Sequence, residues 1–188
     1  MKKRESIVNP KLLVGAAAAV IAGAYFVMQK RRSIPKGVKA VKPLNIKKYM
    51  GKWDEIARID YLYERGLTNT TADYSINKDG SISVLNRGFS PKKGEFVEAH
   101  GKAEFAGSTD EGKLKVSFFG PISSGYNVIK IDAGYNYALV AGEDFNHLWI
   151  LSRKPTIPEK VKEMFLQLAD HYGYDTSRLT WVNHDGKK

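Results

Sequence analysis

The chain has 188 residues, no cysteine and a formal net charge of +10. The lack of cysteine excludes disulfides, thiolate metal sites, a cysteine nucleophile and a lipid-modified N-terminal cysteine. The length suits one domain with an appendage. The basic excess favours anionic surfaces, either lipid headgroups or nucleic acid, although solubility alone is the simpler interpretation.

An apolar stretch follows a short basic segment at the N-terminus. Residues 12–28 carry no charge over 17 positions, and Lys30-Arg31-Arg32 closes the stretch. As a helix it would span ~25 Å, the low end for a bilayer crossing. Two interpretations stay open: an uncleaved anchor, which the length of the run favours, and a signal peptide cut near residues 22–24. We therefore assign residues 1–32 to a signal-anchor or transmembrane segment and residues 33–43 to an extended linker.

The next hundred residues have a strand-like pattern. Short runs rich in Val, Ile, Tyr, Phe and Thr are separated by turn signals such as Asn77-Lys78-Asp79-Gly80. The predicted strands are residues 53–59, 70–76, 81–89, 95–105, 113–119, 126–132, 137–141 and 147–152. Connections this short cannot make parallel crossovers. We therefore expect an all-β fold, an eight-stranded antiparallel up-and-down barrel just wide enough for one small ligand.

The apolar period changes after Pro158, which suits the start of a helix. Val161, Met164, Phe165, Leu168 and Tyr172 then recur at steps of three and four residues and form one apolar stripe. Gly173 ends the predicted helix, and residues 179–182 form a short last strand. The stripe needs a surface to cover, so we expect this C-terminal α-helix to pack on the outer barrel wall.

Four motifs in chain order carry a family resemblance. They are Tyr49-Met50-Gly51-Lys52-Trp53, Gly125-Tyr126-Asn127-Val128-Ile129, Asp132-Ala133-Gly134-Tyr135-Asn136-Tyr137 and Trp149-Ile150-Leu151-Ser152-Arg153. Together they resemble the lipocalins, and the runs at residues 64–67 and 115–121 resemble the bacterial lipocalin and apolipoprotein D branch. Residues 44–188 are thus expected to be a lipocalin domain. The chain departs from that branch at Asp54, where an aromatic residue is common, and lacks the lipidated cysteine of well-known bacterial members.

The resemblance implies a lipid carrier in a bacterial cell envelope. Fatty acids or lysophospholipids are the implied ligands, with no cofactor and no metal, and homodimers are possible. Residues 12–28 would anchor the barrel to the membrane on the periplasmic side, or the barrel would be secreted to the periplasm after cleavage. The resemblance also gives Gly51, Trp53 and Arg153 a structural role, in which Trp53 plugs one barrel end and the Arg153 guanidinium lies across its ring.

The ligand pocket is expected from side chains that alternate along the strands. Every second residue of a strand faces inward, and the lipocalin motifs indicate which residues those are. This predicts the following ligand-binding residues: Ala72, Tyr74, Val84, Asn86, Val116, Phe118, Tyr126, Val128, His147 and Trp149. The same counting turns Ala57, Leu114 and Leu151 inward, with Lys130 as a further candidate, and turns Leu148 and Ile150 outward. Ordinary core filling is the alternative for each inward residue.

The sequence fits two other classes of function, an enzyme and a nucleic-acid-binding protein, less well. No Gly-x-Ser-x-Gly, His-Glu-x-x-His or phosphate-loop motif occurs, and His100, His147, His171 and His184 are scattered. We therefore expect that the protein is not an enzyme. The alternative is a lipocalin-fold enzyme that acts on a small apolar substrate. Nucleic-acid binding is disfavoured because the aromatic residues are predicted to face inward, away from the lysines.

Overall fold

The computed structural model describes residues 32–61 and 64–186, and the predicted membrane segment at residues 12–28 lies outside them. Its elements are α2 (Ile46–Tyr49), β1 (Gly51–Ile59), β2 (Thr68–Ile76), β3 (Ile82–Ser90), β4 (Glu95–Phe105), β5 (Lys113–Phe119), β6 (Ile122–Ile131), β7 (Tyr137–Ala141), β8 (Leu148–Ser152), α3 (Glu159–Tyr172), η1 (Thr176–Arg178) and β9 (Leu179–Trp181). Within the described ranges, no helix combines the length and the apolar character needed to cross a bilayer.

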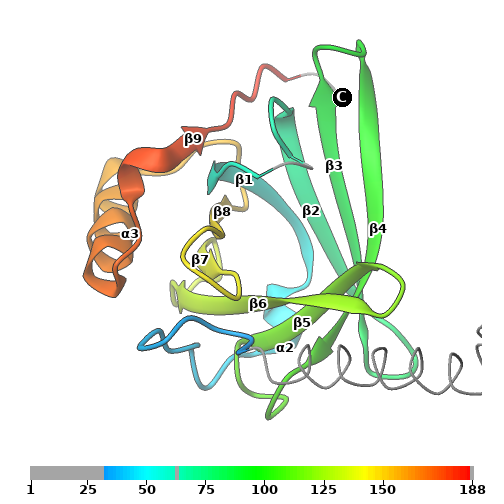
Figure 1. Cartoon of the computed structure of the whole chain (residues 1–188), viewed down its shortest axis with the longest axis vertical. Helices are drawn as coiled ribbons and strands as arrows, with labels where there is room; N and C mark the ends of the chain where they lie inside the picture. Colours follow the sequence, from blue (N-terminus) through cyan, green and yellow to red (C-terminus); the bar gives the residue numbers. More distant parts are fainter. Residues whose placement is uncertain (1–31, 62–63, 187–188) are drawn as a thin grey trace, which may run out of the picture. The chain divides into compact units, whose positions relative to one another are not determined.

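The strands form one closed antiparallel barrel (Figure 1). Each strand from β2 to β7 pairs with the next along the chain, and β1 joins β8 to β2. The first half of β1 pairs with β2, whereas its last residues pair with β9. The predicted eight-stranded up-and-down barrel is confirmed, and the predicted bounds of β4, β5 and β7 match the structure.

Helix α3 lies outside the barrel, as its stripe predicts (Figure 1). Phe165 and Ala169 are fully buried in a cluster that includes Leu148 and Ile150 of β8, the two residues predicted to face outward. Gly173, with φ of 95°, caps the helix in the left-handed conformation that favours glycine. The outer wall and the helix thus form a second core separate from the barrel interior.

A bulge in β1 overturns one orientation predicted from alternation. The β1–β8 register shifts between Glu55 and Ala57, so that Ala57 pairs with Ile150 and Arg58 pairs with Trp149. Ala57 therefore packs in the outer core, and the expectation that it faces inward is wrong. The extra residue of a bulge reverses the alternation beyond it. The consequence is that a charged residue, Arg58, takes the inner position.

A second bulge, in β6, has the same effect on Lys130. The β6–β7 register shifts between Val128 and Lys130, which places Lys130 opposite Leu139 of the outer core. Ile131, opposite Ala138, then packs with the inner cluster instead. The candidate inward position of Lys130 is therefore wrong for the same physical reason.

One barrel end is closed by the residues that the resemblance assigned to it. The Arg153 guanidinium carbon lies 3.8 Å from the centre of the fully buried Trp53 ring. Arg153 Nη1 and Nη2 also donate to carbonyls of residues 48–52 at 2.7–3.0 Å. Gly51 has φ of 88°, and a Cβ there would be 3.6 Å from Arg153 Nη1. The Arg153 guanidinium thus stabilises this end of the barrel by contacting both the Trp53 ring and the carbonyls of residues 48–52.

The segment at residues 33–43 contains no helix or strand, but it is bound to the barrel. Val41 N–H donates to the Val128 carbonyl at 2.8 Å, and Gly112 N–H donates to the Val41 carbonyl at 2.9 Å. Asn127 Nδ2 donates to the Ser33 carbonyl at 2.6 Å, and Val38 is buried in the outer core. The predicted linker is thus attached to the domain along most of its length.

Candidate ligand-binding cavity

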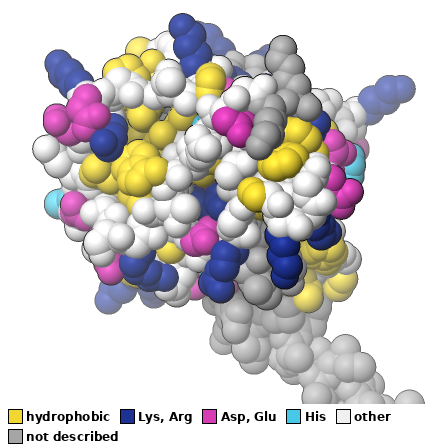
Figure 2. Space-filling model, turned by 90° about the horizontal axis from the view of Figure 1, so that it is seen from above, with side chains coloured by type: hydrophobic (Ala, Val, Ile, Leu, Met, Phe, Trp, Pro, Cys, Tyr) yellow, Lys and Arg dark blue, Asp and Glu magenta, His cyan; other side chains and the backbone are white. Residues whose placement is uncertain are grey.

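The barrel interior holds a cavity of about 710 Å³. Apolar side chains from β2 to β6 and β8 form most of its wall, including Ala72, Ile82, Val84, Val97, Ala99, Ala103, Leu114, Val116, Phe118 and Leu151. Seen from above, hydrophobic side chains are visible on this face among Lys, Arg, Asp and Glu side chains (Figure 2). A cavity of this size is within the range of small-molecule sites.

The structure brings almost all the sequence-predicted pocket residues to this wall. Ala72, Tyr74, Val84, Asn86, Val116, Phe118, Tyr126, His147 and Trp149 all line the cavity. Val128 does not line it. It is fully buried in the inner core beside Gly112, at the level where the linker segment binds.

Three tyrosines form a polar group at the closed end of the cavity. The Tyr126 hydroxyl lies 2.6 Å from the Tyr49 hydroxyl and 2.8 Å from the Tyr74 hydroxyl. Burial is the main cause that raises the pKa of all three side chains, so they are uncharged at neutral pH. Because the hydroxyls satisfy one another, the cavity floor is polar but neutral.

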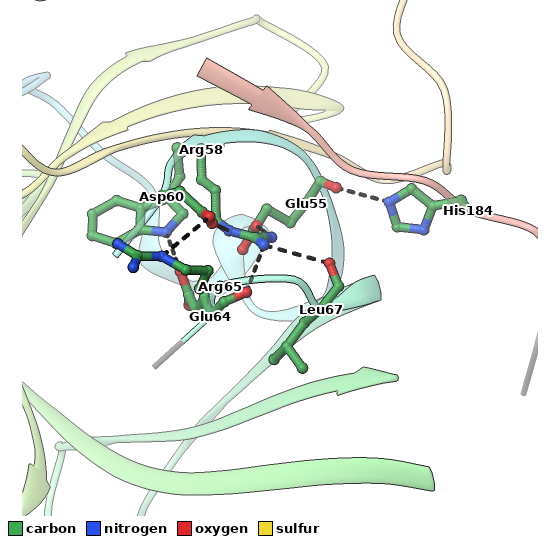
Figure 3. A network of polar contacts seen from close by, with 8 residues as sticks. Glu55, Arg58, Asp60, Glu64, Arg65, Leu67 and His184 are labelled. Carbon is green, nitrogen blue, oxygen red and sulfur yellow. Dashed lines mark hydrogen bonds and ion pairs between the residues drawn. The ribbon is translucent and has the colours of Figure 1, made fainter. Parts of the chain in front are cut away.

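A cluster of charged side chains lies at the opposite end, beneath the loop that joins β1 to β2 (Figure 3). Arg58, 0% exposed, donates from Nη1 to Glu55 Oε1 and from Nε to Asp60 Oδ1, both at 2.7 Å. Its Nη2 donates to the Glu64 carbonyl at 2.6 Å and more weakly to the Leu67 carbonyl at 3.4 Å. One guanidinium thereby holds both ends of the loop.

Two carboxyl groups of this cluster, those of Glu55 and Glu64, line the cavity. Trp149 Nε1 donates to Glu64 Oε2 at 3.1 Å. Burial, and next the charge of Glu55, raise the pKa of Glu64 to about 8, and burial also raises the pKa of Glu55. His184 Nε2 donates to the Glu55 carbonyl at 2.7 Å and ties the C-terminal segment to β1.

Glu55, Arg58 and Glu64 are not among the residues predicted from the sequence to bind the ligand. The alternation that starts at Trp53 already places Glu55 on the inner face, so that signal was available. Arg58 is inward only because of the bulge, and Glu64 lies in a loop, where alternation carries no information. In the described part of the chain, no group of three His, Cys, Asp or Glu side chains could hold a metal ion.

Comparisons with known proteins agree with this architecture. Residues 44–184 match the model of the lipocalin-like domain. The outer membrane lipoprotein Blc of Escherichia coli K12 is 44% identical over 174 residues, which cover 93% of this chain and 98% of that protein. Blc of Vibrio cholerae is 46% identical over 150 residues (79% and 88%), and mouse apolipoprotein D is 32% identical over 147 residues (72% and 75%).

Solved structures give the same fold. Insecticyanin from the tobacco hornworm Manduca sexta superposes with a TM-score of 0.67 at 23% identity, over 82% of this chain and 88% of that one. That likeness concerns the barrel alone. The match of residues 44–184 and the identity to the Blc proteins show that this chain belongs to the lipocalin-like family.

Proposed function

We propose that this protein binds a fatty acid or a lysophospholipid in the barrel cavity and catalyses no reaction. The observation that carries the proposal is the apolar cavity of about 710 Å³, closed at the end where Trp53 and Arg153 lie. Burial of a dozen CH₂ groups would contribute up to ~10 kcal/mol before the costs of ordering the ligand. The cavity is therefore suited to an acyl chain whose polar head stays near the open end.

The same proposal includes a place in the bacterial cell envelope. Its support is the identity to outer membrane lipoproteins of E. coli and V. cholerae, together with the apolar run at residues 12–28. That run would anchor the barrel on the periplasmic side, or it would be removed and the barrel secreted to the periplasm. The basic excess of the chain would draw the barrel toward anionic headgroups. Storage, transport or membrane maintenance are the roles consistent with such a carrier.

Native mass spectrometry of the purified protein tests the proposal. We expect a retained lipid in the wild-type spectrum and its loss in Ala72→Trp, because the indole would fill the cavity from β2. Ser75→Trp, on the outer face of the same strand, is the matched control and should keep the lipid. Equal lipid occupancy in both variants would argue against the cavity as the site. Turnover of a bound lipid by the wild type would instead favour the lipocalin-fold enzyme.

A further inference from the structure

The open end of the cavity combines an excess of acidic over basic side chains with aromatic rings (Figure 3). Glu55, Asp60 and Glu64 surround the guanidinium of Arg58, which already donates to the first two carboxylates. The second guanidinium of the cluster, that of Arg65, lies 3.9 Å from Asp60 Oδ2. Arg58 reaches Glu64 through its backbone carbonyl, and the Glu64 carboxylate makes no ion pair within residues 32–61 and 64–186. One acid that faces the cavity thus has no ion pair of its own among the described residues, although the charge of Arg58 reaches it.

Three aromatic side chains line the same cavity as this acid, and one of them, Trp149, contacts it. The Tyr61 ring lies 5.5 Å from His147 and 6.3 Å from Trp149, centre to centre, and is nearly perpendicular to both, at 71° and 89°. His147 and Trp149 are stacked at 6.1 Å, and Trp149 donates to Glu64. The rings therefore form a corner with a carboxylate at its edge, and electron-rich ring faces attract organic cations.

Thr70 is a further observation, besides the acidic side chains and the aromatic rings, that indicates a polar ligand group at this end of the cavity. Thr70 lines the cavity, is 4% exposed, and its Oγ1 makes no hydrogen bond of adequate geometry with the described residues. It is close enough to the Glu55 carboxyl to lower its pKa. A buried hydroxyl without a full hydrogen bond is costly unless a ligand or water completes it.

From this arrangement we infer that Glu64, with Tyr61, His147 and Trp149, forms a subsite for an ammonium group on the head of the bound amphiphile. The inference rests on the proposed function, because the acyl chain would occupy the apolar part of the same cavity. A primary ammonium would donate hydrogen bonds to Glu64, whereas a quaternary ammonium would lie against the ring faces. Above the raised pKa of Glu64, where its carboxyl is ionised, a bare carboxylate head would be repelled.

Four probes with the same saturated chain test the subsite: tetradecanol, tetradecanoate, tetradecylammonium and tetradecyltrimethylammonium. Their dissociation constants are measured below micelle formation by displacement of the neutral dye nile red from the full-length protein. We expect at least one cationic probe to bind about tenfold more tightly than tetradecanol, which corresponds to ~1.4 kcal/mol. Whichever of the two cations binds more tightly shows whether the carboxylate or the rings dominate. Tetradecanoate binding as tightly as both cations would overturn the inference.

Glu64→Gln assigns the effect to one side chain. The amide keeps an acceptor for Trp149 and the backbone carbonyl for Arg58, so the variant should fold and bind tetradecanol as the wild type does. We expect the cationic advantage to fall about fivefold or more. Glu104→Gln, an equal charge change on the outer face of β4, should keep it. If the cationic probes bind Glu64→Gln with the same preference over tetradecanol as they bind the wild type, the inference is overturned. If the wild type does not bind tetradecanol at all, the proposed function itself is refuted.

The permanent cation allows a second readout in the wild type. Because the pKa of Glu64 is raised, its ionised form, and with it the affinity for tetradecyltrimethylammonium, should increase between about pH 6 and about pH 9. The charged or titratable groups near Glu64 are Glu55, Arg58, Asp60 and Arg65 on its own side, the tyrosines Tyr61 and Tyr74, His147 with its partner Asp144, and His184 beside Glu55. All of them remain in Glu64→Gln, so a slope that persists there belongs to them and overturns the assignment.

Discussion

Replacement of Arg58 by methionine should destabilise the barrel strongly. The guanidinium is fully buried, and its loss removes hydrogen bonds to Glu55, Asp60 and the Glu64 carbonyl at 2.6–2.7 Å. It also leaves the buried Glu55 carboxyl without a partner. Breaking a buried pair from one side costs about 3–5 kcal/mol. Against a total stability of about 5–15 kcal/mol, that loss should lower Tm by about 10 °C or more.

Urea unfolding followed by circular dichroism measures this loss directly. Arg87→Met is the matched control, because the Arg87 side chain is 39% exposed and its ion pair with Glu98 lies at the surface. Such a pair contributes about 1 kcal/mol or less. Glu55→Gln combined with Arg58→Met should recover part of the stability, since the unpaired carboxyl is then gone. A loss in Arg58→Met no larger than in Arg87→Met would refute the idea that the buried cluster holds the loop.

Three further predictions concern other parts of the molecule. The pKa of Glu64 in the folded protein lies at about 8, above the ordinary value of 4.5, so between these pH values the folded state holds a proton that the unfolded state has lost. The free energy of unfolding should therefore fall as the pH rises over this range. The urea midpoint of Glu64→Gln should change less with pH, and the same pH dependence in wild type and variant would contradict the prediction. Arg153→Ala removes the contact with Trp53 and several hydrogen bonds, and should cost about 2–4 kcal/mol in the same unfolding assay, whereas a cost below about 0.5 kcal/mol would speak against its role at the closed end. Phe165→Ala, at a position with 0% exposure, should cost about 3–5 kcal/mol. Met164→Ala should cost less than about 1 kcal/mol, because Met164, although part of the predicted stripe, is 38% exposed; equal costs would mean that the helix does not depend on the burial of Phe165.

Much of the candidate site could be predicted because strand alternation is a local rule. In β2 and β3, and at Trp149 and Leu151 of β8, counting by twos places the correct side chains on the cavity wall. The turn at Asn77–Gly80 is equally local, because Asp79 Oδ1 accepts from the Ser81 N–H and Gly80 supplies the left-handed conformation. Such features depend on neighbours in the chain, which the sequence displays.

The sequence by itself therefore determined the barrel, the outer helix and most of the apolar wall, since each follows from the spacing of apolar residues. Only the tertiary structure decided that Ala57 faces outward, that Arg58 is buried, and that Glu64 meets Trp149. The bulge in β1 lies where the strand changes its partner from β2 to β9, while β8 stays paired on the other side. Contacts between residues 85 positions apart, such as Glu64 with Trp149, arise only when the barrel closes.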